Sequence, residues 1–192
     1  PPALCPLQRC SRGQAQRTPW TPEEKCRWPG ARAVPMASEA PPVRTQFRKR
    51  LQKELEGLKA QSGEDGIFVQ ECDDAEIWRI RVLGAPGTLY AGETFMLRFT
   101  FPQRYPLESP EVVFEGPPPA HPHIYSNGHI CLSILYDAWS PALTVHAVCM
   151  SIVSMLSSAQ EKVRPQDDAS YVSRVGHRSP KLSKWHFDDD RI

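Results

Sequence analysis

The sequence lacks a strong net charge, a long apolar run and paired cysteines. Its 192 residues hold 23 Lys and Arg against 22 Asp and Glu, a formal net charge of +1, so no overall field favours nucleic acid or an anionic membrane. No run approaches the roughly 18 apolar residues of a membrane span, and the Pro-rich start lacks the apolar stretch of a secretion signal. We therefore expect an intracellular protein of the cytoplasm, the nucleus or both, with no nucleic-acid or membrane partner.

The six cysteines form no C-x-x-C pair, so the sequence indicates neither a zinc ribbon nor a redox dithiol. They are Cys5, Cys10, Cys26, Cys72, Cys131 and Cys149. Thiols stay reduced inside the cell. Each cysteine is therefore available, on this evidence, as a nucleophile.

Composition divides the chain into three parts. Residues 1–43 are dense in Pro, Arg, Ala and Gln without periodicity, which predicts a disordered N-terminal extension. Residues 44–187 are predicted to form one core domain, whose C-terminal part is weakly amphipathic and leaves its order open, and 188–192 form a tail. Because the chain begins with Pro and Met36 stands just before the folded region, one hypothesis is that residues 1–35 are an upstream artefact of the reading frame.

The folded part begins with an amphipathic helix and continues with strands. From about Thr45, apolar residues recur every three or four positions among basic ones, and a Gly-containing stretch at 62–66 ends the helix. Period-two alternation then predicts strands at 77–82, 95–101 and 111–114, with another near 67–69. Consecutive strands of this kind form an antiparallel meander.

A long loop over 115–143 separates the strands from a second helix. Thr144 is expected to cap this helix, and Pro165 is expected to break it. Its apolar stripe consists of Val145, Val148, Cys149, Ile152, Met155 and Leu156. The order helix, meander, long loop, helix is typical of the α+β class.

The long loop contains the residues that carry chemistry. In order they are His121-Pro122-His123, Ile130-Cys131-Leu132 and Trp139-Ser140-Pro141-Ala142, with Cys131 eight positions after His123. This pattern resembles the ubiquitin-conjugating enzyme family, in which His-Pro-Asn precedes the active cysteine and Trp-Ser-Pro-Ala follows it. Further matches lie at 49–55, 84–90 and 104–110. The resemblance implies the family's fold: an N-terminal helix, a four-stranded antiparallel meander, an active-site loop, and central and C-terminal helices.

On that resemblance, Cys131 accepts ubiquitin as a thioester from an ATP-using ubiquitin-activating enzyme and passes it to amines of protein substrates. The implied enzyme is a transferase with no cofactor and no metal. A thioester keeps the acyl group activated, and a thiol near its reference pKa of about 8.5 is nucleophilic without a nearby base. The alternative, a buried structural cysteine, suits Cys149 on its apolar stripe far better than Cys131.

Two histidines before Cys131 are expected to shape the site. The resemblance gives His121 a structural role in the loop. It gives His123 the role of the family's Asn, which supports the oxyanion or the loop when an amine attacks. A neutral imidazole can donate one such hydrogen bond, and the alternative is that His123 only packs in the loop. Ser133 is a second departure, because many family members have Asp at this position.

The His-Pro-His signature and residues 179–185 are most similar to the W-type members of the family, which modify α-amino groups of substrate termini rather than lysines. An α-amine, with a pKa of about 7.7–8.0, is substantially neutral in the cell, whereas a lysine near 10.4 is roughly 0.1% neutral. A site that does little to deprotonate its acceptor therefore favours α-amines. Our hypothesis, motivated by His123 and Ser133, is that the chain ligates ubiquitin to disordered amino termini. Asp167 and Asp168 match the place where lysine-directed relatives hold the incoming amine, so lysine transfer stays open, as does a plain helix-capping role for the pair.

Two partner surfaces follow from the same resemblance. Lys49 and Arg50 match the positions of the first helix that meet the activating enzyme. The positions that match the two loops contacting RING or U-box ubiquitin ligases are Leu107, Ser140, Pro141 and Ala142. An apolar residue on a loop tip suits such docking. The alternatives are that the basic pair only solvates a helix face and that Leu107 folds back to pack.

Two rival interpretations come from other classes of protein. A zinc module is suggested by four nitrogen and sulfur ligands within eleven residues, namely His121, His123, His129 and Cys131. Structural zinc ligand pairs are usually set about two to five residues apart rather than one. A non-catalytic ubiquitin-binding variant is the second rival, since a fold does not fix a function. Such variants lack the acceptor cysteine, which is present here.

Overall fold

The computed structural model describes residues 42–74 and 76–187. The predictions for the extension up to residue 41 and for the tail from residue 188 lie outside these residues. The first helix, α1 (Pro42–Ala60), begins three residues before Thr45, because Pro is tolerated in a first turn, where its missing N–H has no helical partner. Residues 42 and 43, which composition assigned to the extension, are therefore helical.

One face of α1 packs into the core. Its buried apolar residues are Phe47, Leu51 and Leu58. Leu55, predicted to share that face, is only half-buried. Glu54 is buried, and its carboxylate accepts hydrogen bonds from Tyr105 OH at 2.6 Å and from Val145 N at 2.7 Å. This carboxylate ties α1 to a loop after the sheet's third strand and to the start of the second helix.

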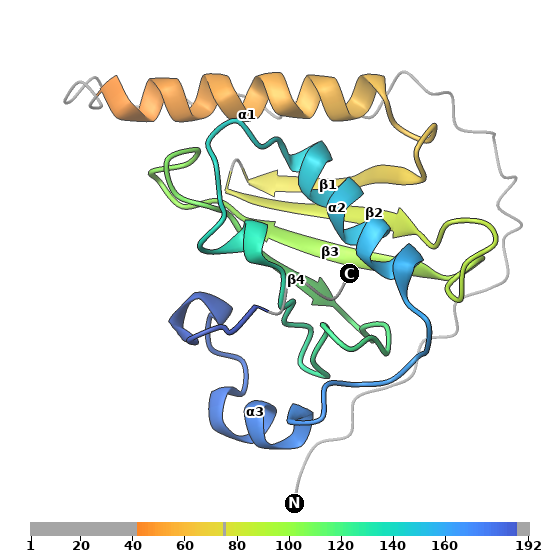
Figure 1. The fold of residues 1–192 in the computed structure, drawn as a ribbon. Helices are drawn as coiled ribbons and strands as arrows, with labels where there is room; N and C mark the ends of the chain where they lie inside the picture. Colours follow the sequence, from red (N-terminus) through yellow and green to blue (C-terminus); the bar gives the residue numbers. More distant parts are fainter. Residues whose placement is uncertain (1–41, 75, 188–192) are drawn as a thin grey trace, which may run out of the picture. The chain divides into compact units, whose positions relative to one another are not determined.

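Four antiparallel strands lie in the sheet in sequence order, which confirms the predicted meander (Figure 1). They are β1 (Ile67–Asp74), β2 (Ile77–Leu83), β3 (Thr94–Thr100) and β4 (Glu111–Glu115). In β2 the side chains of Trp78, Ile80 and Val82 are buried, while the residues between them are half-buried. This alternation shows that one face of the sheet carries the core.

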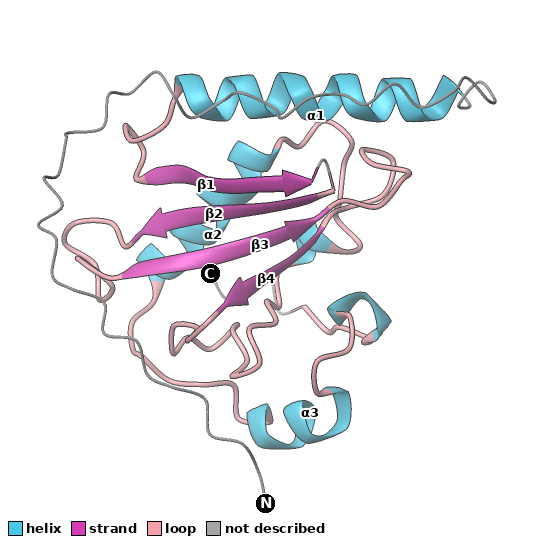
Figure 2. Cartoon of the chain, turned by 180° about the vertical axis from the view of Figure 1, so that it is seen from behind, coloured by secondary structure: helices cyan, strands magenta, loops and turns pink. Residues whose placement is uncertain are grey.

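The second helix, α2 (Val145–Ser158), covers that inner face of the sheet (Figure 2). Thr144 Oγ1 accepts a hydrogen bond from Ala147 N at 3.1 Å, so the predicted cap is confirmed. The predicted apolar stripe is buried throughout. The helix ends seven residues before Pro165, because Ala159 already has an extended backbone conformation. Pro165 therefore does not end this helix.

The part of the chain whose order the sequence left open forms two short elements. These are α3 (Asp168–Val175) and the 3₁₀ turn η2 (Pro180–Leu182), after which the chain runs to Phe187. We call residues 168–187 the C-terminal segment. α3 lies on the β4 side of the sheet, and α1 lies on the β1 side (Figures 1 and 2). No helix within the described ranges is long and apolar enough to cross a membrane.

Candidate active site

The loop that carries Cys131 is held by backbone hydrogen bonds and by two buried isoleucines. Ile124 and Ile130 are fully buried and form an antiparallel bridge with each other. Cys131 N donates to His123 O at 2.8 Å, which closes the loop around the Ile124–Ile130 pair. A segment with little periodicity is therefore ordered, because its few apolar residues all reach the core.

Gly128 fixes this loop against β4. Its φ of +88° is one that residues with a side chain rarely adopt, and an added Cβ would lie 2.3 Å from Phe114 O. The close approach allows Phe114 N to donate to Gly128 O at 2.9 Å. The position of Cys131 relative to the sheet thus depends on a glycine three residues before it.

His121 is buried in the loop with both ring nitrogens engaged. Nδ1 accepts a hydrogen bond from His123 N at 3.0 Å, so Nε2 carries the proton and donates to Met155 O at 3.1 Å. Burial lowers the pKa of His121 to about 4. The ring is therefore neutral and ties the loop to α2.

The imidazole of His123 lies beside that of His121, with 5.5 Å between the ring centroids. The backbone of His123 makes the loop's hydrogen bonds, whereas its half-buried imidazole forms none with another described residue. His123 ties the loop through its main chain. The side chain keeps its hydrogen-bonding capacity.

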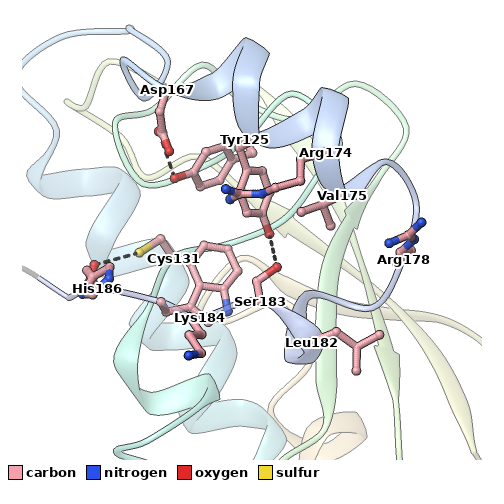
Figure 3. Close-up of a pocket in the computed structure, with 12 residues that line it drawn as sticks. Tyr125, Cys131, Asp167, Arg174, Val175, Arg178, Leu182, Ser183, Lys184 and His186 are labelled. Carbon is pink, nitrogen blue, oxygen red and sulfur yellow. Dashed lines mark hydrogen bonds between the residues drawn. The ribbon is translucent and has the colours of Figure 1, made fainter.

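Cys131 is partly exposed at a pocket of about 650 Å³, which we call the Cys131 pocket (Figure 3). We call the loop around Cys131, residues 115–143, the active-site loop. The walls of the pocket come from this loop at Tyr125, from α3 at Tyr171 and Arg174, and from the rest of the C-terminal segment up to His186. Cys131 Sγ makes a long contact of 3.9 Å to His186 O. The thiol therefore lies at the surface, between the loop and the C-terminal segment.

Cys149 occupies a different environment. Its side chain is fully buried on α2, and burial raises the pKa of its thiol far above the ordinary value. A thiol that neither ionises nor meets solvent is a core residue. Of these two cysteines, Cys131 is the accessible one.

Asp167 and Asp168 attach the start of α3 to the active-site loop. Asp167 Oδ1 accepts from Tyr125 OH at 3.1 Å, and Asp168 Oδ1 accepts from Ser126 N at 2.7 Å. Burial, reinforced by the Asp167 carboxylate, raises the pKa of Tyr125. Asp167 also lines the Cys131 pocket, whereas Asp168 does not.

A hydrogen-bonded cluster that the sequence did not reveal fastens the C-terminal segment to this loop. His129 Nδ1 shares a hydrogen bond of 2.9 Å with Tyr171 OH, which lies 3.1 Å from Ser183 Oγ. Trp185 packs its ring on Tyr136, with centroids 5.0 Å apart. In the sequence, only the aromatic residues Trp185 and Phe187 near the end of the chain pointed to this contact.

The residues expected to meet partners lie on α1 and on two loops. Lys49 is exposed on α1, but Arg50 forms an ion pair with Glu54 and donates to Leu143 O at 3.0 Å, so it is partly a structural residue. Leu107 is 72% exposed and does not fold back. The neighbouring loop exposes Ser140, Pro141 and Ala142.

Two of the four residues in the zinc interpretation, His121 and His129, are engaged elsewhere. Both ring nitrogens of His121 are bonded within the fold, and His129 Nδ1 bonds Tyr171. Within residues 42–74 and 76–187 there is no group of three or more His, Cys, Asp and Glu side chains arranged to hold a metal ion. The geometry therefore gives the zinc interpretation no support.

Comparison with known proteins defines the class. Residues 50–184 match the family model described as "Ubiquitin-conjugating enzyme". A crystal structure of the ubiquitin-conjugating enzyme UbcA1 from Agrocybe aegerita superposes with a TM-score of 0.64 at 40% sequence identity, covering 66% of this chain and 93% of that one. The chain belongs to the ubiquitin-conjugating enzyme family and has its fold, and members of this family are transferases that form thioester intermediates.

Within the family, the resemblance to W-type enzymes is confirmed. The chain is 57% identical over 148 residues to the "Probable ubiquitin-conjugating enzyme E2 W" of Dictyostelium discoideum, covering 77% of this chain and 99% of that protein. It is 56% identical over 148 residues to the "Ubiquitin-conjugating enzyme E2 W" of Caenorhabditis elegans, covering 75% and 96%.

Proposed function

We propose that Cys131 is the residue that carries ubiquitin and that the chain transfers it to α-amino groups of disordered substrate termini. The observation that carries the proposal is the contrast between the two thiols. Cys131 stands at the mouth of a pocket, and Cys149 is sealed in the core. In the first exchange the Cys131 thiolate attacks the ubiquitin thioester of the activating enzyme and releases that enzyme's thiol. In the second, an amine attacks and the Cys131 thiol leaves.

The preference for α-amines rests on the chemistry around the acceptor. The one carboxylate in the wall of the Cys131 pocket, Asp167, accepts the hydroxyl of Tyr125. A carboxylate engaged in this way is a poorer partner for an incoming ammonium group than a free one. An acceptor that is already neutral at cellular pH needs no such help, and α-amines meet that condition far better than lysines.

His123 takes the part of the family's Asn in this proposal. Its imidazole is half-buried beside His121 and has no hydrogen-bond partner among the described residues. A neutral imidazole N–H can donate to the oxyanion that forms when the amine attacks. His121 keeps the loop in place by its bonds to Met155 O and His123 N.

Partner surfaces complete the proposal. Lys49, with Arg50 beside it, meets the ubiquitin-activating enzyme. Leu107 and the exposed residues 140–142 meet a RING or U-box ligase. The two ligase loops are joined by the hydrogen bond from Trp139 Nε1 to Pro106 O at 2.9 Å, so they present one surface. We place this activity in the cytoplasm, the nucleus or both, upstream of protein degradation.

Acceptor competition tests the proposal. The enzyme is charged with ubiquitin, the activating enzyme is quenched, and discharge is followed onto two peptides of the same disordered sequence. One peptide has a free α-amine and no lysine, and the other has an acetylated terminus and a single lysine. We expect discharge onto the free α-amine and loss of that discharge on acetylation. Equal or faster transfer to the lysine peptide would favour the lysine-directed alternative.

A further inference from the structure

The Cys131 pocket has an excess of positive charge. Its charged residues are Arg174, Arg178, Lys184 and Asp167, three cations and one carboxylate, so their net charge is +2. The whole chain carries a net charge of +1. The pocket is therefore a local positive field in a nearly neutral protein.

The cations of this pocket are not neutralised by the described part of the chain. Arg174 and Lys184 are exposed and form no ion pair with residues 42–74 or 76–187. The guanidinium of Arg174 lies over the Tyr171 ring, 5.9 Å from its centroid, and both residues line the pocket. Arg178 also borders a second cavity, which Glu111 lines as well.

Among the nearby carboxylates, Asp167 is already counted in this net charge, and neither Asp168 nor Glu108 lines the pocket. Asp167 accepts the hydroxyl of Tyr125, and the Asp168 carboxylate accepts Ser126 N. Glu108 faces Lys181 at 3.8 Å, outside the lining of the Cys131 pocket. A molecule that enters beside Cys131 would therefore meet Arg174 and Lys184 as exposed cations, of which Lys184 also borders a neighbouring cavity with Glu108 and Asp137.

We infer that this pocket selects acceptors in which acidic residues follow the reactive amine, and that Arg174 and Lys184 set this selectivity. The inference rests on the proposed function, because the acceptor must approach Cys131 through this pocket. An extended chain rises about 3.3 Å per residue. If residue 1 of the acceptor carries the reactive amine, residues 2–4 therefore lie within reach of the long basic side chains on the pocket wall. Carboxylates at these positions form ion pairs, whereas cations there are repelled.

The test uses the full chain and peptides with a free α-amine, without lysine, that carry Asp, Ser or Arg at positions 2–4. Discharge of preformed thioester is measured as kcat/KM. We expect the Asp peptide to react about three- to tenfold faster than the Arg peptide at low salt, as two exposed ion pairs allow. The ratio should fall toward one in 0.5 M salt, where the screening length is a few ångströms (about 4 Å).

Charge reversal gives the decisive comparison. Arg174→Glu combined with Lys184→Glu should invert the Asp-to-Arg ratio, with each rate expressed relative to that of the Ser peptide in the same variant. Lys59→Glu, an exposed reversal at the end of α1, is the matched control and should leave the ratio as in the wild type. Equal rates for the three peptides in the wild type, or a ratio unmoved by the double reversal, would overturn the inference.

Two further arms separate the possible failures. The same flanking residues are placed after a single lysine in acetylated peptides. If α-amines are not modified, the proposed function fails, and the charge preference is then decided on the lysine series. The second arm replaces Asp188, Asp189 and Asp190 by Asn. This variant should still prefer the Asp peptide over the Arg peptide. If that preference appears only in this variant and not in the wild type, the chain's own acidic end occupies the pocket, and the inference is overturned.

Discussion

The active-site loop and the C-terminal segment lie on either side of Cys131 but are held in place by different forces. The loop is held by main-chain hydrogen bonds and by Ile124 and Ile130, which are fully buried. The C-terminal segment is held by side-chain hydrogen bonds and ring contacts, of which those of Tyr171 are the most buried. The loop therefore fixes the position of the Cys131 thiol. We expect that side chains of the segment can be substituted without unfolding the domain.

The difference matters for function because the two sides serve different steps. Accepting ubiquitin requires a thiol at a fixed position, which the loop supplies. Choosing an acceptor requires a surface beside that thiol, and we propose that the C-terminal segment supplies it through Arg174 and Lys184, which line the pocket. Substitutions in the loop should reduce stability and charging together, whereas substitutions in the segment should mainly change the second step.

The largest effect is expected from Gly128→Ala. The added Cβ would lie 2.3 Å from Phe114 O, in addition to the strain at φ +88°, so the free energy of unfolding should fall by about 3 kcal/mol or more. Gly87→Ala is the matched control, because its φ is +77° and nothing lies within 4 Å of the added Cβ. It should cost only about 1 kcal/mol of strain. Urea denaturation measures both, and equal losses would contradict the close fit of the loop.

The second prediction concerns pH and His121. Its folded-state pKa of about 4 lies below the ordinary 6.5, so the unfolded chain binds more protons between these values. The stability from the neutral ring is complete above pH 6.5 and is lost as the pH falls toward 4. Between pH 7.5 and 4.5 this group should remove about 2–3 kcal/mol of unfolding free energy.

His121→Asn provides the comparison for that measurement. The variant lacks the titrating ring, so its unfolding free energy should fall less with acid than that of the wild type. Carboxylates common to both proteins cancel in the difference. Parallel pH profiles for the two proteins would show that His121 is not held neutral by the fold.

A smaller effect is expected from Tyr171→Phe in the C-terminal segment. Loss of the hydroxyl removes the bonds to His129 and Ser183, which should cost about 1–2 kcal/mol, while ubiquitin charging continues. Hydrogen exchange should accelerate at the amides of Leu182 and Ser183, which close η2. When Tyr171→Phe is combined with Ser183→Ala, the loss of unfolding free energy should be smaller than the sum of the two single losses, because both substitutions remove the same bond. Fully additive losses would show that the two residues stabilise the protein independently.

The smallest effect is expected where the two regions join. Asp168→Ala removes the acceptor of Ser126 N at an exposed edge, so the unfolding free energy should fall by only about 0.5–1 kcal/mol. Thermal denaturation detects such a change as a shift of the midpoint by roughly 1–4 °C for a domain of this size. A loss comparable to that of Gly128→Ala would show that the segment is as firmly built in as the loop.

Periodicity predicted the parts of the fold in which neighbouring residues share one environment. Trp78, Ile80 and Val82 alternate because one side of β2 is buried, and the stripe of α2 recurs because one side of that helix is buried. The strands and the helix cap at Thr144 were therefore predictable. The end of α2 was not, because it depends on the extended conformation of Ala159 rather than on Pro165.

The site was predictable where a motif placed residues close in sequence, as with His121, His123 and Cys131. The C-terminal segment was not, because its contacts join residues far apart. Tyr171 meets His129 across 42 positions and carries no local signal of that partner. The ion pair of Arg50 with Glu54 is local, because the two residues lie four apart on α1. The bond of Arg50 to Leu143 O joins residues 93 positions apart and depends on the packing of α1 beside the start of α2.

The central claim is tested most directly by locating ubiquitin on the chain. The wild type, Cys131→Ala, Cys131→Ser and Cys149→Ala are incubated with activating enzyme, ATP and ubiquitin, and the products are separated with and without reducing agent. We predict a reducible adduct for the wild type and Cys149→Ala, none for Cys131→Ala, and a reductant-resistant oxyester for Cys131→Ser. A reducible adduct that survives in Cys131→Ala would contradict the account.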